Sequence, residues 1–392
     1  MHSFDVVVVG GGLIGSSIAF ELASHGLRIT LLDIQQPGRE ASWAAAGMLS
    51  PGPDGPQALP LVPLANESFR LYPDFVRAIE DESGMSVSFA ANGAFEIFTG
   101  PEGVTHRDRL IAQYQDLGLS AELISTDAAA SREPTLNPNS AAIAWLPNEA
   151  TVDPRLLIDA TLTAAKKRGV EMISGRAVTA LLGNHRECTG VLAGGQEIFA
   201  KHVVIAAGSF CARIDASKSG SPIDLSRYAP TYPVRGQMLA LRRSEFHLTH
   251  VLRSDHGYVV PRADGRIIAG STLENVGFNK ETTQEGLRKI LDAAVALAPA
   301  LAGAEIVESW AGLRPGSPDQ LPIIGPTDIP GLLIATGHYR NGILLAPVTA
   351  KLICSWILER KANFNAERFS PLRFSAEKSQ TESGLRSMPA AS

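Results

Sequence analysis

Residues 5–33 have the pattern of a β-α-β unit built around a glycine-rich turn. The run 5–9 is apolar and rich in valine, which is typical of a buried parallel strand, and Gly10, Gly12 and Gly15 follow it in GxGxxG spacing. Apolar residues then recur at helical spacing, and a second apolar strand runs from 27 to 32. The three glycines suit a tight turn, close approach of the backbone to a pyrophosphate, and close helix–strand packing. The unit therefore predicts a dinucleotide site.

The predicted dinucleotide contacts include the turn and the end of the second strand. The first helical turn offers amides and a positive dipole end to phosphate, and Asp33 offers a carboxylate to ribose hydroxyls. FAD- and NAD-binding proteins share this pattern, so the turn alone does not choose between them. From this unit the predicted contacts are Gly10, Gly12, Leu13, Ile14, Gly15, Asp33 and Ile34.

The rest of the chain indicates two interleaved domains. A length of 392 residues exceeds what one core usually supports. Buried-strand patterns recur at 203–206 and 332–335, whereas alternating patterns with turns fill 177–200 and 234–271. We expect an α/β (α+β) protein with a Rossmann-like nucleotide-binding domain and a mixed or antiparallel-sheet substrate domain. The nucleotide domain is assigned to 1–86, 147–222 and 309–370, the substrate domain to 87–146 and 223–308, and a flexible tail to 371–392.

Several local signals predict individual elements. Asp153-Pro154 predicts a capped helix to about residue 168, and the sequence patterns predict further helices at 66–83 and 283–297. Asn92-Gly93 and Asp264-Gly265 predict hairpin turns. The last helix is expected to begin at Pro347 as its first residue.

Composition narrows the function classes. The net charge of −5 gives no reason to expect nucleic acid or an anionic membrane as partner. Three widely spaced cysteines without a CxxC predict neither a disulfide framework nor a metal site. We find no signal peptide and no apolar run long enough to span a bilayer, so a cytoplasmic protein is expected.

Three further segments resemble a known family. They are residues 41–49, residues 310–325 and residues 337–347, and the last of these is the most specific. In order and distance they resemble the D-amino-acid-oxidase-like flavoenzymes, and within them the glycine oxidases of the thiamine pathway. The resemblance covers residues 3–360 and implies FAD as the cofactor. It also implies a homotetramer.

The resemblance assigns further FAD contacts. The segment 41–49 has little side-chain bulk, which lets backbone approach a planar ring, although an ordinary Ala-rich helix start would look the same. Loop 338–344 is expected to wrap the isoalloxazine, and a positive helix end there would stabilise reduced flavin. The additional contacts implied are Ala41, Ser42, Ala46, Gly47, Met48, Val178, Gly208, His338, Tyr339, Arg340, Asn341, Gly342, Ile343 and Leu344. Related sarcosine oxidases hold flavin through a cysteine where this chain has Gly312, so noncovalent FAD is expected.

The resemblance also assigns the substrate contacts. Arg314 matches the arginine that binds the substrate carboxylate, for which a guanidinium fork is well suited, while Arg340 and Tyr258 are placed near the substrate. By position alone Arg314 resembles a solvated surface arginine and Tyr258 a packed strand tyrosine. His338 is assigned to the flavin loop rather than to a general base, because oxidation of a neutral amine needs none. No catalytic side chain is expected.

The implied reaction is oxidative deamination of glycine, sarcosine or small D-amino acids by hydride transfer to flavin N5, with O₂ as acceptor. Glyoxylate formed from glycine would supply thiazole synthesis. Alternatives are a D-amino-acid dehydrogenase with a quinone or protein acceptor, a sarcosine oxidase, a noncatalytic FAD-binding subunit and an NAD-dependent dehydrogenase.

Overall fold

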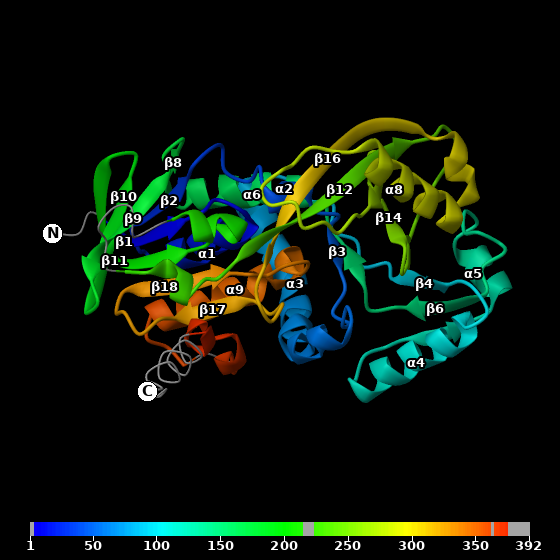
Figure 1. Cartoon of the computed structure of the whole chain (residues 1–392), viewed down its shortest axis with the longest axis horizontal. Helices are drawn as coiled ribbons and strands as arrows, with labels where there is room; N and C mark the ends of the chain where they lie inside the picture. Colours follow the sequence, from blue (N-terminus) through cyan, green and yellow to red (C-terminus); the bar gives the residue numbers. More distant parts are fainter. Residues whose placement is uncertain (1–3, 215–222, 362–363, 375–392) are drawn as a thin grey trace, which may run out of the picture. The chain divides into compact units, whose positions relative to one another are not determined.

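The computed structural model describes residues 4–214, 223–361 and 364–374 and divides into two compact units. The first unit contains residues 1–39, 161–233 and 314–392, and the second contains residues 40–160 and 234–313. Figure 1 shows the elements of each along the chain.

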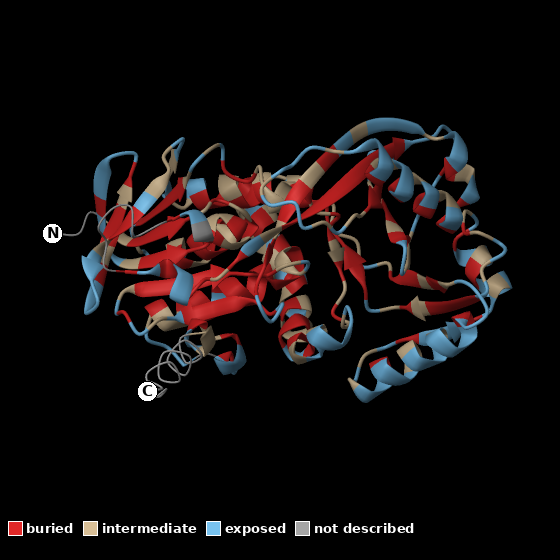
Figure 2. Cartoon of the chain, in the orientation of Figure 1, coloured by how far each residue is buried: buried red, intermediate tan, exposed pale blue. Residues whose placement is uncertain are grey.

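The first unit is built on a mainly parallel sheet in the order β17-β18-β11-β1-β2-β8. Strand β1 pairs in parallel with β11 and β2, β11 pairs with β18, and β2 pairs with β8, while β17 is antiparallel to β18. Strands β1, β2 and β18 are almost wholly buried (Figure 2), as expected for a sheet covered on both faces. The bounds are β1 Phe4–Val9, β2 Ile29–Asp33, β8 Glu171–Ser174, β11 Gln196–Ile205, β17 Ile323–Pro326 and β18 Leu332–Thr336.

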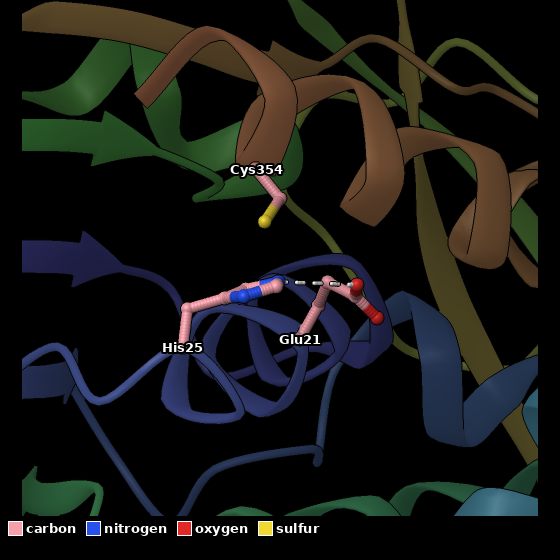
Figure 3. A group of neighbouring side chains, drawn as sticks. All are labelled: Glu21, His25 and Cys354. Atoms are coloured by element: carbon pink, nitrogen blue, oxygen red, sulfur yellow. Dashed lines mark ion pairs between the residues drawn. The ribbon is translucent and has the colours of Figure 1, made fainter. Parts of the chain in front are cut away.

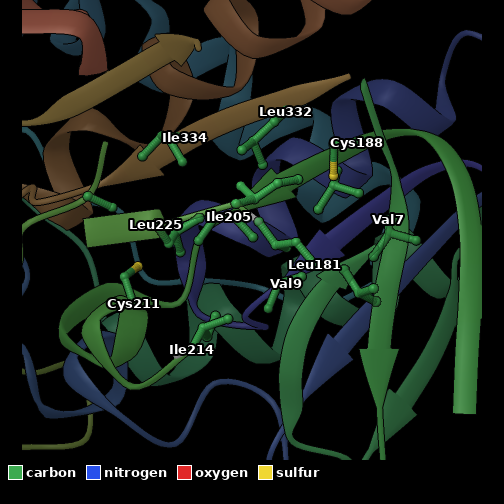
Figure 4. Close-up of a cluster of buried hydrophobic side chains, with 14 of the residues drawn as sticks. Val7, Val9, Leu181, Cys188, Ile205, Cys211, Ile214, Leu225, Leu332 and Ile334 are labelled. Atoms are coloured by element: carbon green, nitrogen blue, oxygen red, sulfur yellow. The ribbon is translucent and has the colours of Figure 1, made fainter. Parts of the chain in front are cut away.

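An antiparallel meander extends this sheet and encloses a core. Strands β9 (Val178–Asn184), β10 (Glu187–Ala193) and β11 pair in succession, which confirms the meander predicted for 177–200. Valine, leucine and isoleucine side chains from the meander, β1 and β18 pack into one buried cluster (Figure 4).

Two helices of the first unit pack on each other. Helix α1 (Leu13–Ala23) completes the predicted β-α-β unit, and it contacts α9 (Gly342–Ile357). The prediction that the last helix begins at Pro347 is wrong. Helix α9 begins five residues earlier, where the Leu345 amide donates to the Asn341 carbonyl at 2.9 Å, and Pro347 lies inside the helix.

The second unit is built on a sheet in the order β16-β12-β15-β14-β13-β4-β6-β5. The β13–β4 pair is parallel, and the other pairs from β12 to β5 are antiparallel. The bounds are β4 Ala94–Phe98, β5 Glu122–Ile124, β6 Ala142–Leu146, β12 Tyr232–Arg242, β13 Val251–Ser254, β14 Gly257–Pro261, β15 Ile267–Gly270 and β16 Glu305–Gly316.

The helices predicted at 66–83, after Asp153 and at 283–297 are confirmed. The Asp153 carboxylate accepts from the Arg155 amide at 2.9 Å, which caps α6 as expected. The remaining elements are α2 Ala41–Ala44, β3 Met48–Leu49, α3 Val62–Ser83, α4 Gly103–Asp116, α5 Thr126–Arg132, β7 Ala150–Thr151, α6 Pro154–Lys167 and α8 Gln284–Leu297.

The two predicted hairpin turns have different outcomes. Asp264-Gly265 does lie in the turn that joins β14 to β15. Asn92-Gly93 does not make a hairpin, because Ala90 bridges to Thr151 whereas β4 pairs with β6 and β13. Gly93 still has the left-handed φ of +77° that such a turn requires, so the local conformation is as expected and the strand partners are not.

The contacts divide the chain differently from the predicted domains at several boundaries. Residues 40–86, 147–160 and 309–313 group with the antiparallel sheet, and residues 223–233 group with the parallel sheet. Strand β3 pairs with β7, which joins segments 40–86 and 147–160 to each other. Of the predicted tail 371–392, residues 371–374 form a short 3-10 helix in which Arg373 pairs with Asp319, and residues 375–392 lie outside the described residues. Among the helices of the described part, none combines the length and apolar character needed to cross a membrane.

Candidate functional site

The predicted site residues of the first unit gather where its parallel strands end. Gly10 follows β1, Asp33 ends β2, Gly208 follows β11, and His338 follows β18 (Figure 1). Parallel strands share one carboxyl edge, and open α/β sheets bind ligands along that edge. The Ala206 amide donates to the Val9 carbonyl at 2.8 Å, which joins the ends of β11 and β1 directly.

The glycine-rich turn requires glycine for reasons that the structure makes explicit. Gly10 has a φ of +106°, and a Cβ there would lie 2.4 Å from the Ala206 carbonyl oxygen. A Cβ on Gly15 would lie 1.9 Å from the Gly10 carbonyl oxygen. Gly12 is the N-cap of α1 and has no side chain with which to cap the helix itself. The turn therefore presents backbone and a positive helix end at the sheet edge.

Asp33 is held in place by backbone amides. Its carboxylate accepts from the Gly11 amide at 2.8 Å and from the Gln35 amide at 3.0 Å. Ile34, the next residue, is 60% exposed. The Arg176 amide donates to the Asp33 carbonyl at 3.2 Å, so the start of β9, where Val178 lies, is close to Asp33. The structure thus brings together the predicted phosphate, ribose and adenine contacts of this unit.

The loop from His338 to Asn341 leads from β18 into α9. The His338 side chain is buried, and its Nε2 lies 3.0 Å from Thr349 Oγ1 on α9. Burial lowers the pKa of His338 to about 3, so the imidazole is neutral at physiological pH. The Asn341 amide donates to the His338 carbonyl at 2.9 Å and closes the turn before the helix. The first turn of α9 contains the predicted contacts Gly342, Ile343 and Leu344.

The two candidate substrate arginines lie on segments that contact each other. Arg314 lies near the end of β16, and Arg340 lies in the loop before α9. The Tyr339 amide donates to the Pro315 carbonyl at 3.0 Å, so the residues adjacent to both arginines are hydrogen-bonded. Arg314 is half-buried and Arg340 is exposed. This is not the isolated surface position that the local sequence of Arg314 alone would suggest.

The candidate residues of the second unit gather around the segment 41–48. Ala44 and Ala46 belong to a buried cluster against which Met48 and Tyr258 pack. Tyr258 lies on β14, and its hydroxyl is 3.5 Å from Met238 Sδ. Gly47 has a φ of +79°, and a Cβ there would lie 2.0 Å from the Val152 carbonyl oxygen. Ala41 and Ser42 form the start of α2.

Gly312 also touches this segment. A Cβ at Gly312 would lie 2.4 Å from the Ala44 Cβ. A cysteine side chain therefore has no room at this position unless the segment shifts.

Three side chains outside the predicted site each donate a hydrogen bond to a backbone carbonyl of segment 41–48; they belong to Arg155, Arg262 and Trp310. Trp310 lies in segment 310–325, whose resemblance to the family was the sequence signal available for it, and Arg262 lies four residues after Tyr258. No sequence signal pointed to Arg155, because its partners are remote in sequence.

One group of possible metal ligands occurs among the described residues. Glu21 on α1 and His25 in the turn after α1 lie near Cys354 on α9, with the ligand atoms within 4.8 Å of one another (Figure 3). Lys351 Nζ already pairs with Glu21 at 2.6 Å, and burial raises the pKa of the Cys354 thiol to about 11. A metal would have to displace the lysine and ionise a buried thiol, so this group does not make a convincing metal site.

Comparison with known proteins identifies the family. Residues 5–356 match the protein family described as "FAD dependent oxidoreductase". The glycine oxidase of Geobacillus kaustophilus is 31% identical over 375 residues, covering 95% of this chain and 97% of that protein. The bifunctional protein ThiO/ThiG of a Synechocystis strain is 34% identical over 383 residues, but the chain spans only 54% of its length.

Solved structures give the same result. The crystal structure of the Geobacillus kaustophilus glycine oxidase superposes with a TM-score of 0.87 at 30% identity, covering 95% of this chain and 99% of that one. The crystal structure of an L-proline dehydrogenase from P. horikoshii superposes with a TM-score of 0.83 at 23% identity, which shows that the two proteins share a fold.

The residues present fit the cofactor that the family implies. The turn at Gly10 and Gly15 is packed so closely that it excludes side chains, Asp33 is held at the strand end by the Gly11 amide, and the start of α9 follows the parallel sheet. With the predicted Rossmann-like fold confirmed, the chain belongs to the D-amino-acid-oxidase-like FAD-dependent oxidoreductases and is related to glycine oxidase.

Proposed function

We propose that the protein catalyses oxidative deamination of glycine, and of sarcosine and small D-amino acids as secondary substrates. Glycine, O₂ and water give glyoxylate, ammonia and hydrogen peroxide. The proposal is supported by similarity to glycine oxidases along nearly their whole length. Bound FAD supplies the acceptor for the two electrons of the substrate C–H bond.

FAD would be held by the residues of the sheet edge and of segment 41–48. Gly10, Gly12 and the first turn of α1 would bind the pyrophosphate, and the Asp33 carboxylate would bind the ribose hydroxyls. The first turn of α9 would lie at the flavin, where a positive helix end favours negative charge on the reduced ring.

Arg314 would bind the substrate carboxylate, with Arg340 and Tyr258 assisting. The observation that carries this assignment is the bond from the Tyr339 amide to the Pro315 carbonyl at 3.0 Å, which fixes the two arginine-bearing segments against each other. A guanidinium pairs with a carboxylate through two parallel bonds, so it orients the substrate as well as binding it.

His338 would have a structural task in this reaction. A buried imidazole whose pKa is about 3 carries no charge at neutral pH and is already bonded to Thr349. The substrate amine would arrive neutral and need no base from the protein.

We further propose that the product serves thiazole synthesis for thiamine, as the similarity to the ThiO/ThiG proteins suggests. A homotetramer is proposed from the same resemblance. Light scattering of the purified protein tests the proposed homotetramer.

Oxygen uptake by the purified yellow protein tests the activity. Glycine, sarcosine, D-alanine and D-proline are compared by kcat/KM, with peroxide measured in parallel. The highest value for glycine is the expected result. Bleaching of the flavin by substrate without oxygen uptake would favour a dehydrogenase with a quinone or protein acceptor, and the highest value for sarcosine would favour a sarcosine oxidase.

A further inference from the structure

The backbone carbonyls of segment 41–48 are held by donors from several elements. The Trp43 carbonyl accepts from Arg155 Nε at 3.4 Å, and the Ala44 carbonyl accepts from Trp310 Nε1 at 3.0 Å. The Ala46 carbonyl accepts from Arg262 Nη2 at 2.5 Å. The Gly47 carbonyl accepts from the Val152 amide at 2.9 Å. Four carbonyls within five consecutive residues are therefore bonded, and three of the donors are side chains.

The donors are themselves locked in place. The Arg155 guanidinium lies 3.5 Å from the centre of the Trp43 ring and 4.6 Å from that of Trp310. It also makes a bidentate pair with Glu308, with both distances 2.9 Å. The arginine is thus fixed by two aromatic faces and a carboxylate, and such a guanidinium loses little further freedom when it donates.

Arg262 is fixed in a similar way. Its Nε lies 3.4 Å from Asp153 Oδ2, and burial lowers its pKa to about 10, which still leaves it charged at neutral pH. Asp153 also caps α6, the helix that carries Arg155. One carboxylate therefore connects two of the donors.

The surroundings leave segment 41–48 little space to move. A Cβ on Gly312 would lie 2.4 Å from the Ala44 Cβ, and one on Gly47 would lie 2.0 Å from the Val152 carbonyl oxygen. Trp43 and Trp310 also contact each other edge to face, with ring centres 6.1 Å apart. Small side chains and tied carbonyls together define one conformation.

We propose that Arg155, Trp310 and Arg262 are positioning residues that hold segment 41–48 in the conformation that receives FAD. This inference rests on the proposed contact of that segment with the cofactor. A segment that is ordered before FAD binds does not lose conformational entropy on binding, so the donors increase FAD affinity without touching it.

The test uses two mild variants of the holoenzyme. Trp310→Phe keeps an aromatic ring and removes the Nε1–H donor, and Glu308→Gln keeps the shape of Glu308 and removes its charge. For each, the FAD dissociation constant is measured by equilibrium dialysis and the visible flavin spectrum is recorded. We expect the FAD dissociation constant to rise about tenfold in Trp310→Phe, the effect of one lost positioning hydrogen bond. In Glu308→Gln it should rise more than about twofold, because Arg155 is then held less firmly. Both variants should show a shifted flavin spectrum.

Arg132→Met is the matched control. Arg132 also lies over a tryptophan in the same unit, 5.0 Å from the centre of the Trp145 ring, but among the described residues it forms no hydrogen bond with segment 41–48. Its FAD affinity should equal that of the wild type. Equal weakening in this control would overturn the proposal, because the effect would then belong to the whole unit.

The proposal is also wrong if both test variants bind FAD within about twofold of the wild type with unchanged spectra. FAD affinity is measured without turnover, so this result is independent of which substrate the enzyme oxidises. Absence of oxygen uptake with every amino acid would refute the proposed activity and leave the affinity measurement intact.

Discussion

Replacing the buried histidine at the start of α9 should change how the protein responds to acid. The folded chain keeps His338 neutral down to a pKa of about 3, because burial disfavours the charged ring, whereas in the unfolded chain the ring titrates near 6.5. Between these two values the unfolded state binds the additional proton. The free energy of unfolding therefore falls as the pH falls through this window.

The size of the effect follows from the two pKa values. Well inside the window, each pH unit shifts the unfolding equilibrium about tenfold, so the step from pH 7 to pH 5 removes about 2 kcal/mol through this residue. His338→Gln has no such group, and its amide can still bond to Thr349. At pH 7 the variant should be less stable than the wild type by about 1 kcal/mol through poorer packing, and acid should reverse that order.

Urea unfolding followed by tryptophan fluorescence, with excess FAD, measures both proteins at pH 7, 6 and 5. The informative quantity is the difference between wild type and variant, because other titrating groups cancel in it. The exposed His106 on α4, replaced by glutamine, controls for general effects of the substitution. A difference that stays within about 0.5 kcal/mol across the range would show that His338 is not held neutral in the folded state.

Three further substitutions test the proposed site. Arg314→Ala should raise KM for glycine at least about tenfold and leave FAD bound, because a charge-assisted pair contributes more than about 1 kcal/mol; a change below about threefold in steady-state assays would remove Arg314 from the site. Gly12→Val should block the pyrophosphate and give colourless protein, so a yellow variant with full occupancy by absorbance would refute the placement of the turn. Gly312→Cys should lower the free energy of unfolding by about 1–3 kcal/mol through its contact with Ala44. Acid precipitation of the wild-type protein should leave all flavin in the supernatant, and flavin in its pellet would contradict noncovalent attachment.

The parts of the fold that could be predicted are those specified by local sequence. The turn at Gly10 needs a left-handed φ and a close backbone approach, and both requirements are visible as glycine spacing. The cap by Asp153 on α6 is likewise a relation between neighbours.

The start of α9 was predicted incorrectly for a physical reason. Proline is favoured in a first helical turn, but it can also lie further in, where it costs one backbone bond. Helix α9 starts at Gly342 because the turn from His338 to Asn341 closes first. The His338 side chain is buried and contacts Thr349 on α9, a packing that its sequence neighbours do not reveal.

The hydrogen-bond donors to segment 41–48 could not be predicted from local sequence. Arg155 and Glu308 are 153 residues apart, and their pairing exists only because the second unit brings α6 and β16 together. The hydrogen bond from Tyr339 to Pro315 is similar, since it joins two motifs whose residues were recognised separately.

The burial of every cysteine has a consequence for the proposed release of peroxide. Cys188, Cys211 and Cys354 are all buried, and burial raises each thiol pKa to about 11. Peroxide oxidises the thiolate, and these thiols are both protonated and shielded. The proposed oxidase would thus resist inactivation by its own product at sulfur. After many turnovers without catalase, denatured protein should still contain three titratable thiols, the number in the sequence.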